Sequence, residues 1–467
     1  MDKNFSSVAQ GFRKRTLVTA KLSAKLGVGV AKSLIKHKTQ GALSGKVVHL
    51  ADNVLNADLS IIENREELTK DAVDMASKLF EDMDQLKGLV MKFGQMASYM
   101  TTQLPPEAQR VMAKLQAEAS SLPFYEIKSL LVKELGRPLE DVFESFESEA
   151  VAAASIGQVH KAVYKGRAVA VKIQYPGVKE AISSDLSLID RFVPMAAMAS
   201  SVMGMSIDNK ALFKELHDRI VEECDYKREA KNQQYAFTCW PSDKNIIIPE
   251  VVEELCSDNV LVTEFMEGKG FYEFRDTASQ EAKNRAAETL FRMSYESIFK
   301  FGFFNGDPHP GNYLFRDNGQ VVFLDFGCVR YFESEFLESW RGAVKAVLGG
   351  DKDSFKIFIR EMGFVGNESK FDWDYQWDLY GFIVAPITSD GPFTYTKEYK
   401  EEGNRFFIYE NKNKKSMNLP KPFLLVNRLQ WGLKTILVDL QATGDFSTSF
   451  KEALYYDDER FVKGGKR

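Results

Sequence analysis

The sequence predicts an α+β protein with a helical beginning, a strand-rich middle and a long helical end. Apolar residues recur every three or four positions between residues 51 and 148, as on one face of a helix. The pattern changes near Val151, where short apolar runs rich in valine indicate strands. From Ala282 onward the chain is mostly helical again. We therefore expect a small sheet between two helical regions.

Composition narrows the class of protein. The chain has 467 residues, which favours two or three domains at about 150 residues each. Hydrophobic residues make up 44% and charged residues 27%, which excludes a mostly disordered, collagen-like or coiled-coil chain. Four cysteines without a CxxC pair argue against a disulfide scaffold or cysteine-rich zinc site and favour a reducing compartment. A net charge of −5 argues against nucleic acid as a partner.

Residues 1–50 are strongly basic, with ten Lys or Arg and one acid, Asp2. Several lysines recur at spacings of seven and four, so they share one helical face. Three interpretations stay open: a solvated helix face, peripheral contact with an anionic membrane surface, and a targeting segment. The longest uncharged stretch, between Arg191 and Asp208, has 16 residues, fewer than the roughly 20 of a spanning helix. We expect no transmembrane helix.

The elements follow from local patterns. A helix is expected over Tyr125–Leu135, ending at Gly136. Two strands, Val159–Tyr164 and Ala168–Gln174, are joined by the turn Lys165–Gly166. The remaining expected elements are helices to Arg191 and over Leu212–Lys231, and strands at Ile246–Val252, Asn259–Phe265, Tyr313–Phe315 and Gln320–Leu324. The aromatic run Phe371–Tyr380 is interpreted as core packing.

The first chemical motif is Asp307-Pro-His-Pro-Gly-Asn312. An Asp and an Asn five residues apart have the D-x-x-x-x-N spacing of a kinase catalytic loop. Asp307 is then a candidate to orient or deprotonate an acceptor hydroxyl, and Asn312 a candidate oxygen ligand for magnesium. The alternative is a plain turn rich in proline and glycine.

The second motif is Asp325-Phe-Gly327, directly after the expected strand ending at Leu324. A carboxylate at the end of a buried strand can bind a magnesium ion that bridges phosphates. The tripeptide alone is weak evidence. Because it follows the first motif so closely, the kinase interpretation of both motifs becomes stronger.

The third motif is Val169-Ala-Val-Lys172, a lysine at the end of an apolar strand. Kinases place a lysine there to contact the α and β phosphates, although a strand lysine is more often an exposed edge charge. A buried lysine needs a carboxylate partner. The candidates are Glu222, Glu223 and Glu229. The order of lysine strand, helix glutamate, D-x-x-x-x-N and DFG is that of a kinase.

Two kinase features are missing. The glycine-rich loop before the lysine strand is replaced by an alanine-rich stretch, 152–159, with the single glycine Gly157. Alanine restricts the backbone and prevents its closest approach to phosphates. The HRD motif is also absent, because Asn305-Gly306 precedes Asp307.

Together these motifs resemble the UbiB family of atypical protein-kinase-like proteins, also called the AarF-domain or ABC-one family. The resemblance runs from about Leu86 to Val329. Its motifs are Lys92-Phe-Gly-Gln95 (KxGQ), AAASIGQVHKA at 152–162, VAVKIQYPGV at 169–178, ECDYKREA at 223–230, GDPHPGN at 306–312 and LDFG at 324–327. Departures from the family pattern occur at Ala150-Val151, Leu115-Gln-Ala117 and Cys328.

The resemblance implies a two-lobed, protein-kinase-like fold with an N-terminal helical extension over the active site. The expected segments are a basic helical part, 1–70, a KxGQ extension, 71–148, an N-lobe, 149–268, and a C-lobe, 269–467. Lys92 and Gln95 would form a regulatory lid that pairs with Glu223 and Asp225. Glu229 is the preferred partner of Lys172.

The resemblance also implies the ligands. ATP or ADP with Mg²⁺ is the expected cofactor set, with Asp307 and Lys172 catalytic and Asn312 and Asp325 as metal ligands. The expected nucleotide contacts are Ala152, Ala153, Ala154, Ser155, Gly157, Gln158, Lys172 and Glu229. The alanine-rich stretch and the lid disfavour protein substrates.

We therefore expect an atypical kinase or ATPase acting on a small molecule, a lipid precursor or water, in isoprenoid-quinone or membrane-lipid metabolism. A lipid or quinone-precursor ligand is a second expected partner. The alternative is a non-catalytic, nucleotide-gated lipid-binding scaffold for a biosynthetic complex. The expected location is the cytoplasm or the mitochondrial matrix, including a peripheral position on the inner membrane.

Overall fold

The computed structural model describes residues 122–154, 156–179, 222 and 224–456. They fall into two compact units. The first comprises residues 1–130, 150–159 and 174–224, and the second comprises 131–149, 160–173 and 225–467. Lys92, Gln95, Ser155, Glu223 and the basic segment 1–50 lie outside the described residues. The domain boundaries expected from the sequence remain predictions.

Helix α6 (Phe124–Leu135) confirms the expected helix, and Gly136 follows it with a φ of +70°. The expectation of helix through residue 148 is wrong. A short 3-10 helix η3 (Leu139–Asp141) follows, and then strand β1 (Ser145–Phe146) pairs antiparallel with β3 (Gly157–Tyr164). Gly136 and Pro138 end the helical spacing, and the pairing with β3 then holds this segment extended.

The main sheet has the strand order β1-β3-β4-β6, and β2 (Ala152–Ala154) pairs with β3. Strands β3 and β4 (Arg167–Gln174) confirm the expected hairpin. Lys165 and Gly166 have φ angles of 49° and 73°, the positive values that a tight two-residue hairpin turn requires. Val169, Val171 and Ile173 of β4 are at most 1% exposed. Successive side chains alternate across a strand, so Lys172 projects from the opposite face.

Helix α9 (Tyr226–Cys239) extends beyond the expected end at Lys231, because its buried face continues to Ala236. The strand expected over Ile246–Val252 is shorter. It consists of β5 (Ile246–Ile247), after which Val251 makes an isolated bridge to Thr263 before the 3-10 helix η4 (Glu253–Leu255). Strand β6 (Val260–Glu264) then pairs antiparallel with β4.

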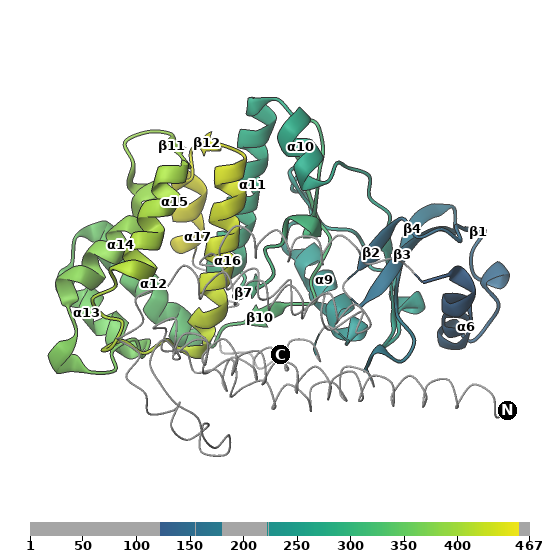
Figure 1. Ribbon diagram of the computed structural model, residues 1–467, viewed down its shortest axis with the longest axis horizontal. Helices are drawn as coiled ribbons and strands as arrows, with labels where there is room; N and C mark the ends of the chain where they lie inside the picture. The colour runs from purple at the N-terminus through teal and green to yellow at the C-terminus, as the bar shows by residue number, and fades with distance from the viewer. Residues whose placement is uncertain (1–121, 155, 180–221, 223, 457–467) are drawn as a thin grey trace, which may run out of the picture. The chain divides into compact units, whose positions relative to one another are not determined.

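The rest of the second unit is mainly helical (Figure 1). Its larger helices are α10 (Phe271–Thr277), α11 (Gln280–Phe299), α12 (Ser334–Gly349), α13 (Lys352–Glu361), α14 (Trp373–Thr388), α15 (Lys397–Asn404), α16 (Lys421–Asp439) and α17 (Ser447–Leu454). A 3-10 helix, η6 (Glu368–Lys370), precedes α14, and a π-helical turn, η7 (Arg405–Tyr409), follows α15. The aromatic run at 371–380 is core, as expected, since Phe371, Tyr375 and Tyr380 are at most 7% exposed. No helix within the described ranges is both long and apolar enough to cross a bilayer.

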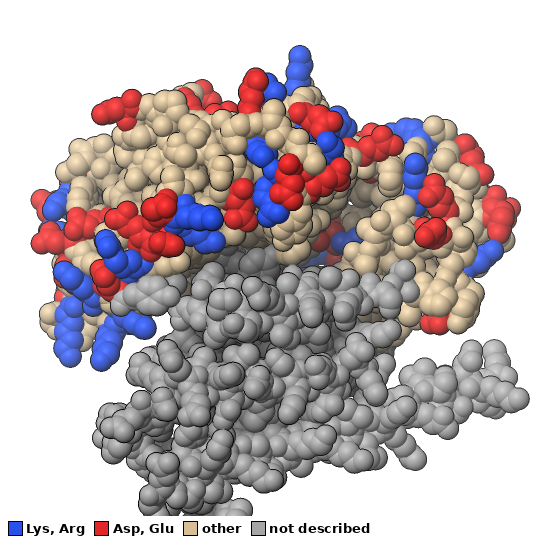
Figure 2. Space-filling view, turned by 45° about the horizontal axis from the view of Figure 1, so that its top comes forward, with Lys and Arg blue, Asp and Glu red and all other residues tan. Residues whose placement is uncertain are grey.

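Short strands interrupt these helices. Strands β8 (Tyr313–Phe315) and β9 (Val321–Phe323) form a hairpin that β5 extends, in the order β5-β9-β8. Strands β7 (Phe303–Asn305) and β10 (Val329–Tyr331) pair antiparallel, as do β11 (Phe393–Thr394) and β12 (Thr443–Gly444). The sequence predicted β8 and β9 but missed the other four. On the face shown in Figure 2, acidic and basic side chains are interspersed over the described surface.

Candidate active site

The β8–β9 hairpin brings two of the expected site residues to one place. Tyr313 at the start of β8 pairs with Phe323 at the end of β9. Asn312 lies just before this pair and Asp325 just after it, and the Leu324 amide donates to the Asn312 carbonyl at 3.0 Å. A tight antiparallel ladder therefore fixes the separation of the two residues.

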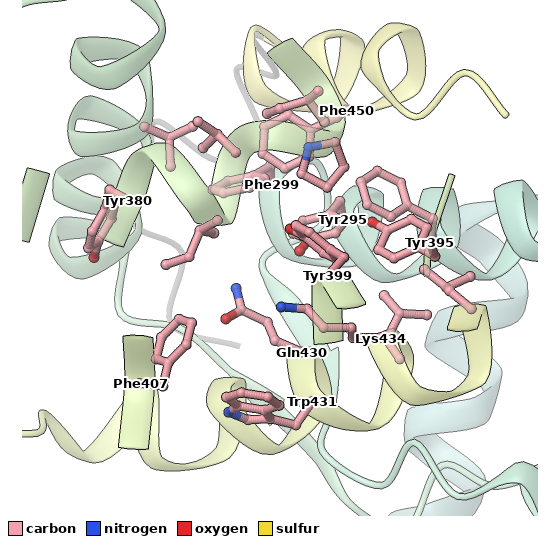
Figure 3. A pocket seen from close by; sticks show the side chains of 18 of the residues that line it. Tyr295, Phe299, Tyr380, Tyr395, Tyr399, Phe407, Gln430, Trp431, Lys434 and Phe450 are labelled. Carbon is pink, nitrogen blue, oxygen red and sulfur yellow. The ribbon is translucent and has the colours of Figure 1, made fainter. Parts of the chain in front are cut away.

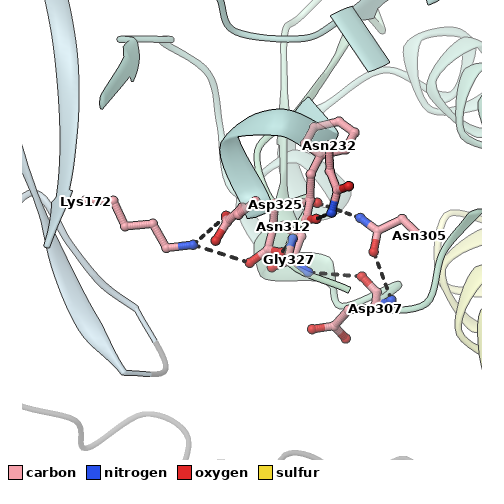
Figure 4. A network of polar contacts seen from close by, with 9 residues as sticks. Lys172, Asn232, Asn305, Asp307, Asn312, Asp325 and Gly327 are labelled. Atoms are coloured by element: carbon pink, nitrogen blue, oxygen red, sulfur yellow. Dashed lines mark hydrogen bonds and ion pairs between the residues drawn. The ribbon is translucent and has the colours of Figure 1, made fainter. Parts of the chain in front are cut away.

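Asp307 is held through its backbone. The Asp307 amide donates to Asn305 Oδ1 at 3.1 Å, and its carbonyl accepts from Asn312 Nδ2 at 3.0 Å. Asn305 in turn donates from Nδ2 to the Asp325 carbonyl at 2.5 Å. Figure 4 shows the Asp307 carboxylate directed away from these backbone contacts. The 307–312 segment is thus a braced loop that presents a carboxylate.

Lys172 reaches this network from strand β4 (Figure 4). Its Nζ lies 2.7 Å from Glu229 Oε1 and 3.8 Å from Asp325 Oδ2. The Lys172 side chain is 19% exposed, that of Glu229 3% and that of Asp325 32%. Of the three glutamate candidates, the structure thus pairs Lys172 with Glu229.

The charge on Lys172 is strongly favoured. Burial opposes the charge, but the carboxylates of Glu229 and Asp325 outweigh burial and raise the pKa of Lys172 well above its usual value. The ring of Tyr226 lies 4.9 Å from Nζ and adds a cation–π contact. Lys172 is therefore a fixed positive charge that points toward the acidic end of the β8–β9 hairpin.

Helix α9 supports this arrangement with a buried polar stripe. Glu229, Asn232, Gln233 and Ala236 share one face of the helix and are at most 5% exposed. Asn232 donates from Nδ2 to the Phe326 carbonyl at 3.0 Å, which ties the helix to the segment after Asp325. Asp225 accepts from the Arg228 amide at 3.0 Å and caps the first turn. Asp225, expected in the lid, is thus the cap of the helix that holds Glu229.

Tyr313, the first residue of β8, lies close enough to Asp307 and Asp325 to feel their charges. Burial, and secondarily the carboxylates of Asp307 and Asp325, raise the pKa of the Tyr313 hydroxyl. The phenol therefore stays neutral at physiological pH and adds no charge near Asp307 and Asp325.

The residues present fit a magnesium ion in donor chemistry. Magnesium prefers hard oxygen ligands and commonly takes only one or two from the protein. Asp325 offers Oδ2, because its Oδ1 accepts from the Gly327 amide at 2.9 Å. Asn312 offers its amide oxygen, because its nitrogen is committed to Asp307. Within the described ranges, no cluster of three or more His, Cys, Asp or Glu suited to a metal is present.

The alanine-rich stretch belongs to the first unit. Ala152–Ala154 form strand β2 and pair in antiparallel register with Val159, Gln158 and Gly157 of β3. Gln158 is 1% exposed, and its amide exchanges hydrogen bonds of 2.7 and 3.2 Å with the Leu122 backbone. That amide therefore anchors the chain before α6. The nucleotide contacts expected of Ala152, Ala153, Ala154, Gly157 and Gln158 remain predictions.

Three features were missed by reasoning from the sequence. Asn305 and Asn232 hold the backbone of the site through hydrogen bonds. Only Asn305 could have been found in the sequence, because the Asn305-Gly306 pair directly precedes Asp307. The third is a close contact between α16 and the 307–312 loop. A Cβ added at Gly432 would lie 2.2 Å from Pro308 Cγ, so the helix backbone touches the proline ring. The isolated glycine within the helical spacing of α16 was the available signal.

Comparison with known proteins agrees with this geometry. The model of the ABC1 atypical kinase-like domain matches residues 114–358. Mitochondrial atypical kinase COQ8B of Rattus norvegicus is 32% identical over 68% of this chain and 60% of its own length. Mitochondrial atypical kinase COQ8 of Saccharomyces cerevisiae is 32% identical over 67% of this chain and 62% of its own length. The chain thus spans about three fifths of these relatives.

A solved structure agrees as well. The Mycobacterium tuberculosis protein Rv3197, determined as a complex with erythromycin, superposes with a TM-score of 0.61 at 27% identity. The superposition covers 84% of this chain and 98% of Rv3197. The expected kinase-like α+β fold is therefore confirmed.

Proposed function

Because the chain belongs to the ABC1 atypical kinase-like family, we propose that it binds ATP or ADP with magnesium and transfers or hydrolyses the terminal phosphoryl group. The observation that carries the proposal is the Lys172 ammonium held between Glu229 and Asp325, at 2.7 and 3.8 Å. A lysine fixed by one buried carboxylate and aimed at a second, more exposed one is suited to polyphosphate. A purely structural ion pair would not need the braced carboxylate of Asp307 beside it.

Each residue would have a distinct task. Lys172 would neutralise charge on the α and β phosphates, and Glu229 would keep its ammonium in place. Asp325 and Asn312 would hold magnesium, which when bound neutralises charge on the phosphates. Asp307 would orient the acceptor hydroxyl or water and accept its proton. Catalysis would then rest on positioning and charge neutralisation.

We further propose that the acceptor is a small molecule, a lipid precursor or water, and that the reaction supports isoprenoid-quinone or membrane-lipid metabolism. Support comes from the family and from its mitochondrial relatives. A lipid or quinone-precursor ligand, peripheral membrane contact through residues 1–50 and a mitochondrial location belong to the same proposal. The alanine-rich stretch disfavours a protein acceptor, because it lacks the glycines of a kinase phosphate loop.

The first experiment is thermal unfolding of the whole chain with Mg-ATP and Mg-ADP. A ligand at 100 times its dissociation constant stabilises the folded state by about 2.7 kcal/mol, a readable rise in Tm. The expected result is a magnesium-dependent rise that Asp325→Asn abolishes. The control Asp317→Asn should keep it, because Asp317 is 78% exposed and pairs with Lys269. No rise in the wild type with either nucleotide would refute the proposal.

A second experiment separates an enzyme from a nucleotide-gated scaffold. Phosphate release from Mg-ATP should fall at least 100-fold in Asp307→Asn, while nucleotide binding persists, because Asp307 acts on the acceptor rather than on the nucleotide. Asp317→Asn again serves as the control. Nucleotide binding without measurable turnover in either protein would favour the scaffold.

A further inference from the structure

A cavity in the helical part of the second unit lies apart from the candidate active site. Helices α11, α12, α14, α15, α16 and α17 line it, together with the π-helical turn η7. Its volume is about 70 Å³. One water requires roughly 10–15 Å³ on this measure, so the cavity admits about five to seven water-sized groups. Most of its lining is aromatic or aliphatic, so the cavity is suited to an apolar group.

A lysine lies at this apolar cavity. Lys434 of α16 places its Nζ 4.7 Å from the ring centroid of Tyr399, 4.9 Å from that of Phe382 and 5.2 Å from that of Trp431. Three rings at this range partly stabilise a cation. Neither an ion pair nor a hydrogen bond to Lys434 occurs among the described residues. The ammonium is therefore partly desolvated, and the described part of the chain places no carboxylate beside it.

This arrangement disfavours the charged form of the lysine. Burial alone lowers the pKa of Lys434 to about 8. Lys172 shows the contrast, because its two carboxylates raise its pKa despite burial. An anion placed beside Lys434 would supply what Glu229 and Asp325 supply to Lys172.

Neutral hydrogen-bonding groups line the same cavity. Tyr295 and Gln430 are hydrogen-bonded to each other. Figure 3 shows the Gln430 amide and the Lys434 amine ending in the same space. Tyr380, also in the lining, is 4% exposed, and within the described structure its hydroxyl has no hydrogen-bond partner. The cavity thus offers one cation and several neutral polar groups within aromatic walls.

We propose that this cavity binds the carboxylate of an alkyl monocarboxylic acid, with the carboxylate paired to Lys434 and the alkyl chain among the rings. The single charge of Lys434 is balanced by one anion. A carboxylate can accept hydrogen bonds from both the Lys434 ammonium and the Gln430 amide. The volume limits the enclosed part to about six carbons. The acid is either a short free acid or the carboxylate end of a longer fatty acid. The proposal does not depend on nucleotide binding.

The direct test is calorimetric titration of the whole chain, without nucleotide, at pH 7. Hexanoate should bind at least tenfold tighter than hexanol, which has the same chain without the charge. Lys434→Met should remove this preference while keeping the binding of hexanol. Lys397→Met, at an exposed lysine of α15, should behave as the wild type. Equal affinity of the wild type for hexanoate and hexanol would overturn the proposal.

A second measurement needs no variant. An amine with a lowered pKa reacts readily with amine-directed reagents at pH 8, and mass spectrometry of peptides can follow Lys434 and Lys397 together. Hexanoate should protect Lys434 but not Lys397, and hexanol should protect neither. Absence of protection by hexanoate would contradict the proposal even if the Lys434 variant failed to fold.

Dodecanoate distinguishes the two sources of the carboxylate. Tighter binding of dodecanoate than of hexanoate would identify the end of a fatty acid as the occupant. The reverse order would identify a short free acid. Failure of both acids to bind would overturn the site itself.

Discussion

At the scale of single residues, Glu229 is the buried partner of the Lys172 ammonium. It is 3% exposed and holds the Lys172 ammonium at 2.7 Å. Removing one partner of a buried pair leaves the other charge uncompensated, which typically costs about 3–5 kcal/mol. Asp325, at 3.8 Å, would still compensate part of the charge.

We therefore expect Glu229→Gln to lower the free energy of unfolding by about 3 kcal/mol, the low end of that range, in denaturant titrations. It should also weaken Mg-ATP binding. Glu250→Gln is the matched control, because Glu250 pairs with Arg167 at 2.7 Å but is 48% exposed. That variant should lose less than about 1 kcal/mol. Equal losses of unfolding free energy in the two variants would show that the buried pair contributes no more to stability than an exposed one.

Lys434 gives a prediction about pH. Its pKa is about 8 in the folded protein, against an ordinary value of 10.5. Between these two values Lys434 binds more protons in the unfolded chain, so its contribution to the stability of the wild type rises with pH across this window. Tyr295 and Tyr399 face the lysine and stay neutral over most of the window, because burial raises the pKa of Tyr295 to about 12 and that of Tyr399 further.

Lys434→Met should therefore be the more stable protein at pH 7, by at most about 3 kcal/mol. The advantage should shrink between about pH 8 and pH 10.5, because the wild-type lysine is then neutral in the folded state. Unfolding midpoints measured at several pH values test this. Parallel pH profiles for the two proteins would mean that Lys434 is not desolvated.

At the scale of elements, helix α16 has no room for a side chain at Gly432. Gly432→Ala would place a Cβ 2.2 Å from Pro308 Cγ, and the rigid proline ring cannot rotate away. Overpacking of this kind costs about 1–3 kcal/mol. We expect a lower Tm and reduced phosphate release, because the displaced loop carries Asp307 and Asn312.

Gly381→Ala in α14 is the matched control. A Cβ at Gly381 has no neighbour within 4 Å. Alanine is the better helix former by about 0.5–1 kcal/mol, so this variant should be as stable as the wild type or more so. A Gly432→Ala protein with unchanged Tm and turnover would show that the 307–312 loop can move aside without loss of stability or activity.

The elements also show what sequence reasoning can reach. Helix α6 and the β3–β4 hairpin were predicted because their signals are local, a helical spacing closed by Gly136 and a turn at Lys165–Gly166. Strands β7, β10, β11 and β12 were missed, because two or three residues carry no periodicity and their pairing is long-range. The extent of α9 was missed because its buried face, which includes Asn232 and Gln233, is polar.

The residues of the candidate site also divide into those that the sequence predicts and those that it does not. Lys172, Asp307, Asn312 and Asp325 lie in short motifs with fixed spacing, so the sequence was enough to select them. Asn305 and Asn232 act through backbone carbonyls distant in the chain, at Asp325 and Phe326. No pattern in one sequence indicates such partners. The cavity at Lys434 was unpredictable for the same reason, because its lining comes from six separate helices.

At the scale of the whole molecule, the tryptophans report on one unit. All five, Trp240, Trp340, Trp373, Trp377 and Trp431, lie in the second unit. The buried apolar core of that unit is continuous from Ala236 to Leu454. We expect thermal unfolding followed by tryptophan fluorescence to show one sigmoidal step, because a continuous core unfolds cooperatively.

That step should move to higher temperature with Mg-ATP, since Lys172, Glu229, Asp307, Asn312 and Asp325 all belong to the second unit. Circular dichroism, which reports on helices in both units, provides the comparison. Two separate fluorescence steps would show that the helical core and the polar network around Lys172 unfold independently.

The contact between Gly432 and Pro308 also has an evolutionary consequence. The α16 backbone and the proline ring fill the space between them, so neither position can gain volume alone. A relative with a side chain at the position of Gly432 should therefore carry a smaller residue at that of Pro308. The two positions should change together across the lineage, although they lie far apart in the chain.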